Sequence, residues 1–219
     1  MPSIAPENPR NRPLVWVTGA GGLIGNYLVQ TAPAFAPDFN VQGLMRADLD
    51  LTDRAAVHEA FRKAKPGIVI HCAALSRSPV CQAQPALARQ LNVEVAAHLA
   101  ELAAGIPFLF FSSDLVFDGR HGHYPESAPT HPLSVYAETK VAAEQFVLAN
   151  PKHTVVRTSL NGGTSPAGDR AFNEELRCAW QAGQSLRLFT DEFRSPIPAV
   201  VTARAVWELA GLNQPGLYH

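Results

Sequence analysis

Short apolar runs alternate along the chain with longer segments of mixed polarity, and the two kinds of segment predict different elements. The apolar runs are rich in β-branched and aromatic residues, a composition that favours strands. The run at 67–71 shows no polar alternation, as is typical of a parallel strand covered on both faces. The predicted strands cover residues 14–18, 41–44, 67–71, 106–112, 154–158 and 185–189.

The segments between these runs predict helices, because their apolar residues recur at helical spacing. The pattern is most regular in the stretch that ends at Gly105, where leucine and valine recur every three or four positions. Thr52 or Asp53 is a suitable N-terminal cap for the second helix. The predicted helices cover residues 23–31, 52–63, 85–104, 135–149, 172–182 and 199–209.

Strands that alternate with helices imply an α/β fold of the Rossmann type, a doubly wound parallel sheet with helices on both faces. We expect one such domain over 14–219, after a flexible, proline-rich leader at 1–13. The chain stops at 216–219 in what resembles the start of a strand. Two interpretations stay open: a natural end at the edge of the sheet, or a truncated chain that lacks a final helical segment.

Composition and charge narrow the classes of partner. The formal net charge is −1 without basic or acidic blocks, so neither nucleic acid nor an anionic membrane is an expected partner. No apolar run approaches the roughly 20 residues of a membrane span, and we expect a cytoplasmic protein. The 3 cysteines form no CxxC pair, which indicates reduced thiols. The spacing of His121, His123 and His131 suits a metal, but they lie in a loop and lack the helix placement of an HExxH site, so no metal is expected.

A glycine-rich turn joins the first predicted strand to the first predicted helix. A dinucleotide diphosphate needs backbone N–H donors that no side chain obstructs, and it gains from the positive end of a helix dipole. Gly19 permits the tight turn, Gly22 the close approach of phosphates, and Gly25 the packing of helix against strand. With Leu23 and Ile24 at the start of the helix, this turn predicts a nicotinamide-dinucleotide site.

The tip of the second strand distinguishes the two nicotinamide cofactors. An acidic residue there accepts a hydrogen bond from the ribose 2′-hydroxyl of NAD, whereas an arginine suits the 2′-phosphate of NADP. Arg46 lies at this tip, which favours NADP(H). Asp48 and Asp50 follow closely and keep NAD(H) open as an alternative.

Tyr136 and Lys140 share one face of a predicted helix, because they are four residues apart. A carbonyl reductase needs a proton donor for the developing alkoxide, and a free phenol has a pKa of about 10. A neighbouring ammonium is expected to lower that pKa. Ser113 ends the fourth strand region at the sheet edge where ligands bind, and its hydroxyl is a suitable donor to the substrate oxygen.

Together these residues resemble the extended short-chain dehydrogenase/reductase superfamily and, more narrowly, the dTDP-4-dehydrorhamnose reductases. The resemblance covers nearly the whole chain, and its most specific stretch runs from Ser-Ser-Asp into Val-Phe-Asp-Gly at 112–119. It implies hydride transfer from the nicotinamide to C4 of a nucleotide-linked 4-keto sugar, with Tyr136 as the acid. The other motifs that carry it lie at 48–53, 71–74, 136–140, 156–159, 191–196 and 216–219.

The resemblance assigns roles beyond the catalytic trio. It places Ala73 and Ala74 along the cofactor, together with Asp50 and Leu51 of the aspartate-rich motif. Asn92 matches the structural asparagine of the family and is counted with the cofactor-binding candidates.

The substrate side, expected mainly from 160–219, departs from the family pattern. Where the family tends to carry an aromatic residue, this chain has Leu-Asn, ending at Asn161. Where the family has a small residue before Ser-Pro, this chain has Arg194. Arg77 and Arg194 suit a substrate diphosphate, because arginine forks match phosphate oxygens, and surface or structural salt-bridge roles stay open for each as an equal alternative. Asn161 and Asp114 complete the substrate-binding candidates.

Two other functions and one assembly stay open. An epimerase or dehydratase uses the same cofactor, and Asp114 follows Ser113, although the adjacent glutamate of dehydratases is absent. A non-catalytic NAD(P)-binding regulatory subunit is the other alternative, since the regulatory subunit of methionine adenosyltransferase is a relative of this kind. Relatives also pair through the helices that carry Tyr136 and Asn92, which leaves a homodimer open.

Overall fold

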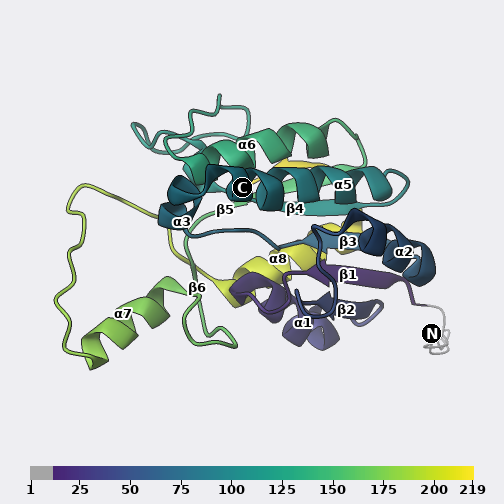
Figure 1. Ribbon diagram of the computed structural model, residues 1–219, viewed down its shortest axis with the longest axis horizontal. Helices are drawn as coiled ribbons and strands as arrows, with labels where there is room; N and C mark the ends of the chain where they lie inside the picture. Colours follow the sequence, from purple (N-terminus) through teal and green to yellow (C-terminus); the bar gives the residue numbers. More distant parts are fainter. Residues whose placement is uncertain (1–11) are drawn as a thin grey trace, which may run out of the picture.

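The computed structural model describes residues 12–219, so most of the predicted leader lies outside the described residues. Eight strands form two sheets within these residues. They are β1 (Leu14–Thr18), β2 (Asn40–Leu44), β3 (Ile68–His71), β4 (Phe108–Ser113), β5 (His153–Thr158), β6 (Asn161–Gly162), β7 (Ile197–Pro198) and β8 (Gly216–Tyr218). The main sheet has the order β2-β1-β3-β4-β5-β8, and all of its neighbouring strands run parallel (Figure 1).

Helices cover both faces of this sheet. They are α1 (Leu23–Phe35), α2 (Arg54–Ala64), α3 (Ser78–Ala83), α4 (Pro85–Arg89), the π-helix η2 (Gln90–Glu94), α5 (Val95–Leu102), the 3₁₀ helix η3 (Asp114–Val116), α6 (Val135–Leu148), α7 (Phe172–Gln181) and α8 (Ala199–Leu212). Helices α2, α5 and α6 lie on one face, and α1 and α8 on the other (Figure 1). The predicted Rossmann-type fold is confirmed. Among residues 12–219, no helix has the length and apolar character needed to cross a membrane.

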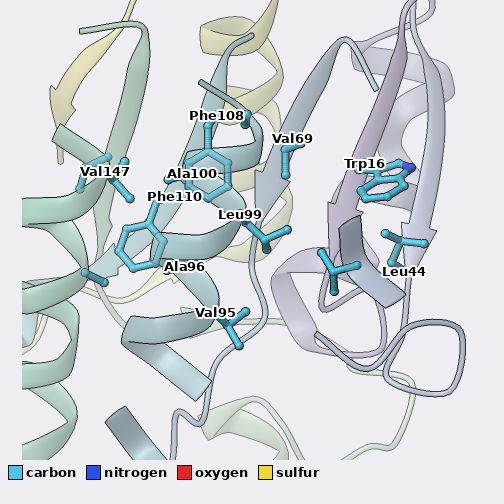
Figure 2. Packing of buried hydrophobic residues seen from close by; sticks show 14 residues of the cluster. Trp16, Leu44, Val69, Val95, Ala96, Leu99, Ala100, Phe108, Phe110 and Val147 are labelled. Carbon is cyan, nitrogen blue, oxygen red and sulfur yellow. The ribbon is translucent and has the colours of Figure 1, made fainter. Parts of the chain in front are cut away.

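Alternate residues of the central strands enter opposite layers of the core. Trp16 of β1, Val69 of β3 and Phe108 of β4 belong to the layer beneath α2, α5 and α6, and Figure 2 shows Val69 between the other two. Val17 enters the other layer, around Trp207 of α8. Burial of apolar side chains on both sides therefore fixes the sheet, and with it the loops at its carboxyl edge.

The order of the strands reverses in the middle of the sheet. From β1 the chain moves outward to β2, and it then returns past β1 to β3 and continues to β8. The connections that follow β1 and β3 leave in opposite directions, so the carboxyl ends of these strands are the topological switch point, where open α/β sheets form a crevice. Open α/β sheets bind their ligands in such a crevice.

Two predicted elements are corrected by the structure. The strand predicted at 185–189 does not form: Leu188 and Phe189 are exposed, and none of the strands within residues 12–219 pairs with this segment. The helix predicted over 85–104 is divided into α4, η2 and α5, because a π-helical turn interrupts its regular bonding. Asp53 caps α2 as expected, since its Oδ1 accepts from the Ala56 N–H at 3.0 Å.

Candidate active site

The glycine turn after β1 lies tightly against the end of β3. Gly19 has a φ of +70°, which favours glycine, and a β-carbon there would lie 2.7 Å from the backbone nitrogen of Ala73. A β-carbon on Gly25 would collide with the carbonyl of Gly19. Side chains at these positions would collide with the backbone and force the turn, the helix and the strand apart.

The first turn of α1 supplies backbone donors to the same crevice. The first N–H groups of a helix have no intrahelical acceptor. Gly22 caps α1 without a side-chain hydrogen bond, and the first turn has no acidic residue. The N–H groups of Leu23 and Ile24 therefore have no capping side chain to occupy them. Donors of this kind, with bare glycines around them, fit the diphosphate of a dinucleotide.

The charged groups beyond β2 differ in whether they form hydrogen bonds within the protein. Asp48 Oδ2 accepts from the Met45 N–H at 2.8 Å. Asp50 Oδ1 accepts from the hydroxyl of Thr52 at 2.7 Å and from its N–H at 2.9 Å, and these bonds lower the pKa of Asp50. Both carboxylates hold local turns, whereas Arg46 is exposed at the strand tip. The role of Arg46 toward the 2′-phosphate of NADP therefore stays a prediction.

Asn92 supports the loop after β3. Its Oδ1 accepts from the Leu75 N–H at 2.7 Å, and its Nδ2 donates to the Leu75 carbonyl at 3.1 Å and to Thr139 Oγ1 at 3.0 Å. The buried amide is thus fully engaged inside the protein. Asn92 positions the loop that carries the half-buried Ala73 and Ala74 and has no free hydrogen to offer a cofactor. Leu51 packs against the core layer below.

Ser113, Tyr136 and Lys140 converge near the carboxyl end of β4. Ser113 is the last residue of the strand, and its Oγ accepts from the Leu115 N–H at 3.2 Å as η3 begins. Tyr136 lies in the first turn of α6, which Ser134 caps, and Lys140 lies one turn later. A strand end and a helix start therefore bring together three groups that the sequence separates.

The ammonium of Lys140 is buried and bonded to the backbone of β4. Its Nζ donates to the Phe111 carbonyl at 2.9 Å and lies 4.7 Å from the ring centroid of Phe110. The distance from Nζ to the ring centroid of Tyr136 is 5.8 Å. Burial lowers the pKa of Lys140 to about 8, which still leaves it largely protonated at neutral pH.

Tyr136 is held in its protonated form. Burial raises the pKa of Tyr136 to about 12, and a hydrogen bond with Ser113 counteracts this only in part. The prediction that Lys140 lowers this pKa is wrong for the present arrangement, because the Lys140 ammonium is bonded to the Phe111 carbonyl instead. A phenol that keeps its proton is suited to act as an acid.

A family described as the RmlD substrate binding domain matches residues 14–219. The chain belongs to this family. The dTDP-4-dehydrorhamnose reductase of Streptomyces griseus is 34% identical over 223 residues, which cover 97% of this chain and 71% of that protein. These findings place the chain in the extended short-chain dehydrogenase/reductase superfamily, as its motifs predicted.

Other relatives of this RmlD-family chain are of two kinds. A crystal structure of dTDP-4-dehydrorhamnose reductase from Bacillus anthracis, in complex with NADP, has a TM-score of 0.86 and 25% identity, and the match covers 95% of this chain and 74% of that one. Methionine adenosyltransferase 2 subunit beta of Xenopus laevis is 37% identical over 155 residues. That match covers 68% of this chain and 46% of the relative, so the chain spans less than half of that protein.

Three of the four substrate candidates of this RmlD-family chain are engaged in contacts within the protein. Arg194 forms an ion pair with Asp114 at 2.9 Å, beside Ser113. Asn161 Oδ1 accepts from the Thr202 hydroxyl at 2.6 Å. Its Nδ2 donates to the Thr158 hydroxyl and to the Ser159 carbonyl, each at 2.9 Å. Asn161 therefore joins β6 to α8 and is buried, contrary to its predicted place in the substrate pocket.

Arg77 lies at the outer margin of the crevice. It is exposed, and its Nη2 lies 3.4 Å from the Asp169 carbonyl, 3.8 Å from the Asp169 carboxylate and 3.9 Å from Glu175. Pairs this exposed contribute little to stability. Arg77 bridges the loop before α3 to the region of α7, and its role toward a substrate diphosphate stays a prediction.

Residues 12–219 contain no group of three or more His, Cys, Asp or Glu that could hold a metal ion. The loop histidines His121 and His123 are exposed. His71 is buried, with its Nδ1 2.7 Å from Thr18 Oγ1, and burial lowers its pKa to about 3. His71 is thus a neutral link between β1 and β3.

Two functional supports escaped the sequence analysis. Glu174 is buried at the start of α7 and accepts from the Ser165 hydroxyl at 2.6 Å and from the Ala171 N–H at 3.0 Å. A glutamate three residues after a helix cap is a recognisable signal for such a role. Ser159 donates to Asp114 at 2.8 Å. No local pattern announces that contact, because the partners are 45 residues apart.

Proposed function

We propose that this chain is the cofactor-binding and catalytic part of an NADP(H)-dependent reductase of a nucleotide-linked 4-keto sugar. The observation that carries the proposal is the convergence of Ser113, Tyr136 and Lys140 beside a glycine cradle that fits a dinucleotide diphosphate. The relatives from Streptomyces griseus and Bacillus anthracis bear the name of such a reductase, and the second was solved with NADP.

The cofactor is held by groups from β1, α1 and β2. The N–H groups of Leu23 and Ile24 bind the diphosphate, and the guanidinium of Arg46 binds the 2′-phosphate of NADP(H). NADP(H) is preferred over NAD(H), because a 2′-hydroxyl leaves Arg46 without its phosphate and both neighbouring carboxylates are engaged locally. When bound, the reduced nicotinamide supplies the hydride.

The protein supplies the proton and holds the substrate oxygen. Tyr136 stays protonated at neutral pH and donates its proton to the carbonyl oxygen as negative charge develops there. The Ser113 hydroxyl donates a hydrogen bond to the same oxygen. Lys140 donates to the Phe111 carbonyl near the end of β4 and so helps to fix the position of Ser113.

A non-catalytic NAD(P)-binding regulatory subunit is the second candidate. The 37% identity to methionine adenosyltransferase 2 subunit beta favours it, whereas the assembled Ser113, Tyr136 and Lys140 favour an enzyme. The dehydratase alternative needs a free acid/base group at Asp114. The ion pair between Asp114 and Arg194 counts against that role.

The test is NADPH oxidation, followed by absorbance, when the purified chain is mixed with dTDP-4-dehydro sugars. We expect turnover by the chain, and a loss on the order of 10²–10⁴-fold in the Tyr136→Phe variant, because general acid catalysis contributes that much. NADPH binding, followed by fluorescence, should be unchanged in this variant.

Tyr218→Phe is the matched control, because its hydroxyl bonds the Gln214 carbonyl within the β8 edge of the sheet. This variant should keep full turnover. Binding of NADPH without turnover by the unmodified chain would contradict the reductase proposal and favour the regulatory subunit.

A further inference from the structure

The carboxylate of Asp114 lies beside the catalytic serine and receives donors from two distant segments. Arg194 Nε donates to Oδ2 at 3.1 Å, and its Nη2 lies 2.9 Å from both Oδ1 and Oδ2. Ser159 Oγ donates to Oδ2 at 2.8 Å. Ser113 Oγ also donates to Asp114, to Oδ1 at a longer 3.3 Å.

These distances rank the donors that compete for Asp114. Hydrogen bonds between guanidinium and carboxylate are charge-assisted and roughly twice as strong as neutral ones. A separation of 3.3 Å is long for an O–H···O bond, so Ser113 contributes the weakest contact. Because Arg194 and Ser159 satisfy the carboxylate, Ser113 can turn its single proton toward a ligand. Its oxygen meanwhile accepts from the Leu115 N–H.

Without Arg194 this order reverses. The carboxylate of Asp114 would keep only neutral hydroxyl donors. It would then attract the Ser113 proton more strongly than the substrate oxygen does. A hydroxyl has one hydrogen to donate. Once Ser113 gives that hydrogen to Asp114, it presents only lone pairs to a substrate carbonyl, and two acceptors do not bind each other.

We propose that Arg194 is a positioning residue of the active site: by holding the Asp114 carboxylate, it leaves the Ser113 hydroxyl free to donate to the substrate oxygen. This inference rests on the proposed reductase function and adds a residue to its machinery. It assigns Arg194 to the protein's own carboxylate, the salt-bridge role that the sequence left open beside a substrate diphosphate.

The same ion pair controls the charge that Tyr136 meets. Burial is the main cause that raises the pKa of Tyr136, Asp114 raises it further, and Arg194 lowers it. Loss of Arg194 alone therefore exposes the phenol to an uncompensated carboxylate, whereas loss of both charges does not. The groups that face Tyr136 from the elements around it are Ser113, Asp114, Cys81, Lys140 and Arg194.

The decisive variants are Arg194→Met and the double variant Arg194→Met with Asp114→Asn. We expect Arg194→Met to lower kcat with a dTDP-4-dehydro sugar by roughly 10- to 100-fold, as for partial loss of a donor to a developing oxyanion. NADPH affinity should be unchanged. The double variant should recover most of the lost kcat, because no carboxylate remains to take the Ser113 proton. If Arg194 only tethered its segment, the double variant would be as slow as the single one.

A second readout does not depend on turnover. Carbon-13 NMR of labelled tyrosine, with Tyr136→Phe to assign the signal, follows ionisation of Tyr136 in the chain without ligands. Tyr136 should ionise at the highest pH in Arg194→Met and at a lower pH in the double variant. Identical titrations in both variants and the unmodified chain would overturn the inference.

Arg204→Met is the matched control, because Arg204 pairs with Glu208 at 2.8 Å on the exposed side of α8. It should change neither kcat nor the titration of Tyr136. An unmodified chain that never reduces a keto sugar would refute the proposed function alone. The order of the Tyr136 titrations would still decide the role of Arg194.

Discussion

The two sides of the crevice are held together in different ways. On the cofactor side, β1 and β3 lie between two apolar layers, and Val15, Val17 and Ile70 are completely buried. On the substrate side, α7 and residues 182–196 extend away from the sheet, and the side chains of Trp180 and Phe193 are 84% and 91% exposed (Figure 1). Burial of apolar surface fixes the first side, and a few polar contacts fix the second.

These polar contacts lie at the two ends of the extended segment. At its start, Glu174 is completely buried and accepts from the Ser165 N–H at 2.8 Å and from the Arg170 N–H at 3.1 Å. At its end, Arg194 returns the chain to Asp114. The contrast teaches that cofactor geometry is set by the fold, whereas substrate geometry depends on individual ion pairs and caps.

Tryptophan tests this contrast with one residue type. Trp207 is buried against α1 and its Nε1 donates to the Leu28 carbonyl at 3.1 Å, whereas Trp180 is exposed. Trp207→Ala should lower the free energy of unfolding by about 3–5 kcal/mol, the usual cost of a large cavity. Trp180→Ala should change it by no more than about 0.5 kcal/mol. Denaturant unfolding measures both, and equal losses would contradict the comparison.

The cofactor side can be tested by adding a single β-carbon at a glycine. Gly19→Ala introduces a β-carbon against Ala73 and should weaken NADPH binding at least roughly 10-fold, or about 1.4 kcal/mol. Gly168→Ala is the matched control, because Gly168 has nearly the same φ, +73°, but nothing within 4 Å of the added carbon. It should cost stability through backbone strain alone and leave NADPH affinity intact. Equal loss of affinity in both variants would refute the close approach at Gly19.

The pH dependence of stability tests the substrate side, because it reports on the ionisation of Glu174. Hydrogen bonds, that from Ser165 foremost, lower the pKa of Glu174 to about 2 from an ordinary value of 4.5. A depressed carboxyl pKa stabilises the fold above the ordinary value, and this contribution is lost as the pH falls through about 2.

Glu174→Gln should therefore destabilise the protein at neutral pH, and the difference from the unmodified chain should shrink below pH 4.5. Thermal unfolding across this range measures the effect. Glu175→Gln, at the exposed neighbouring position, should show no such dependence. A constant difference between Glu174→Gln and the unmodified chain would contradict the role assigned to Glu174.

The fold was predictable where local pattern and tertiary structure agree. Apolar runs marked β1 to β5 of the main sheet, the end of the chain resembled the start of a strand where β8 forms, and the cap at Asp53 marked α2. The run at 185–189 failed because apolar content does not provide a neighbouring strand. The π-helix around Asn92 was hidden for a related reason: its side chain bonds a loop 17 residues earlier in the sequence.

The site was predictable as a set of residues but not as a set of contacts. Ser113, Tyr136 and Lys140 were identified by their spacing and their elements, and the structure brings them together. The pKa of Tyr136 was predicted in the wrong direction, because the sequence shows neither the burial that raises it nor the bond that directs the Lys140 ammonium to the Phe111 carbonyl. The ion pair between Asp114 and Arg194 spans 80 residues, beyond any local signal.

The central claim is that the crevice at the end of β1 binds NADP(H). The most direct measurement is a fluorescence titration of the purified chain with NADPH and, separately, with NADH, repeated for Arg46→Ala. The account predicts that NADPH binds more tightly than NADH and that Arg46→Ala removes the preference. Binding of neither dinucleotide would contradict it.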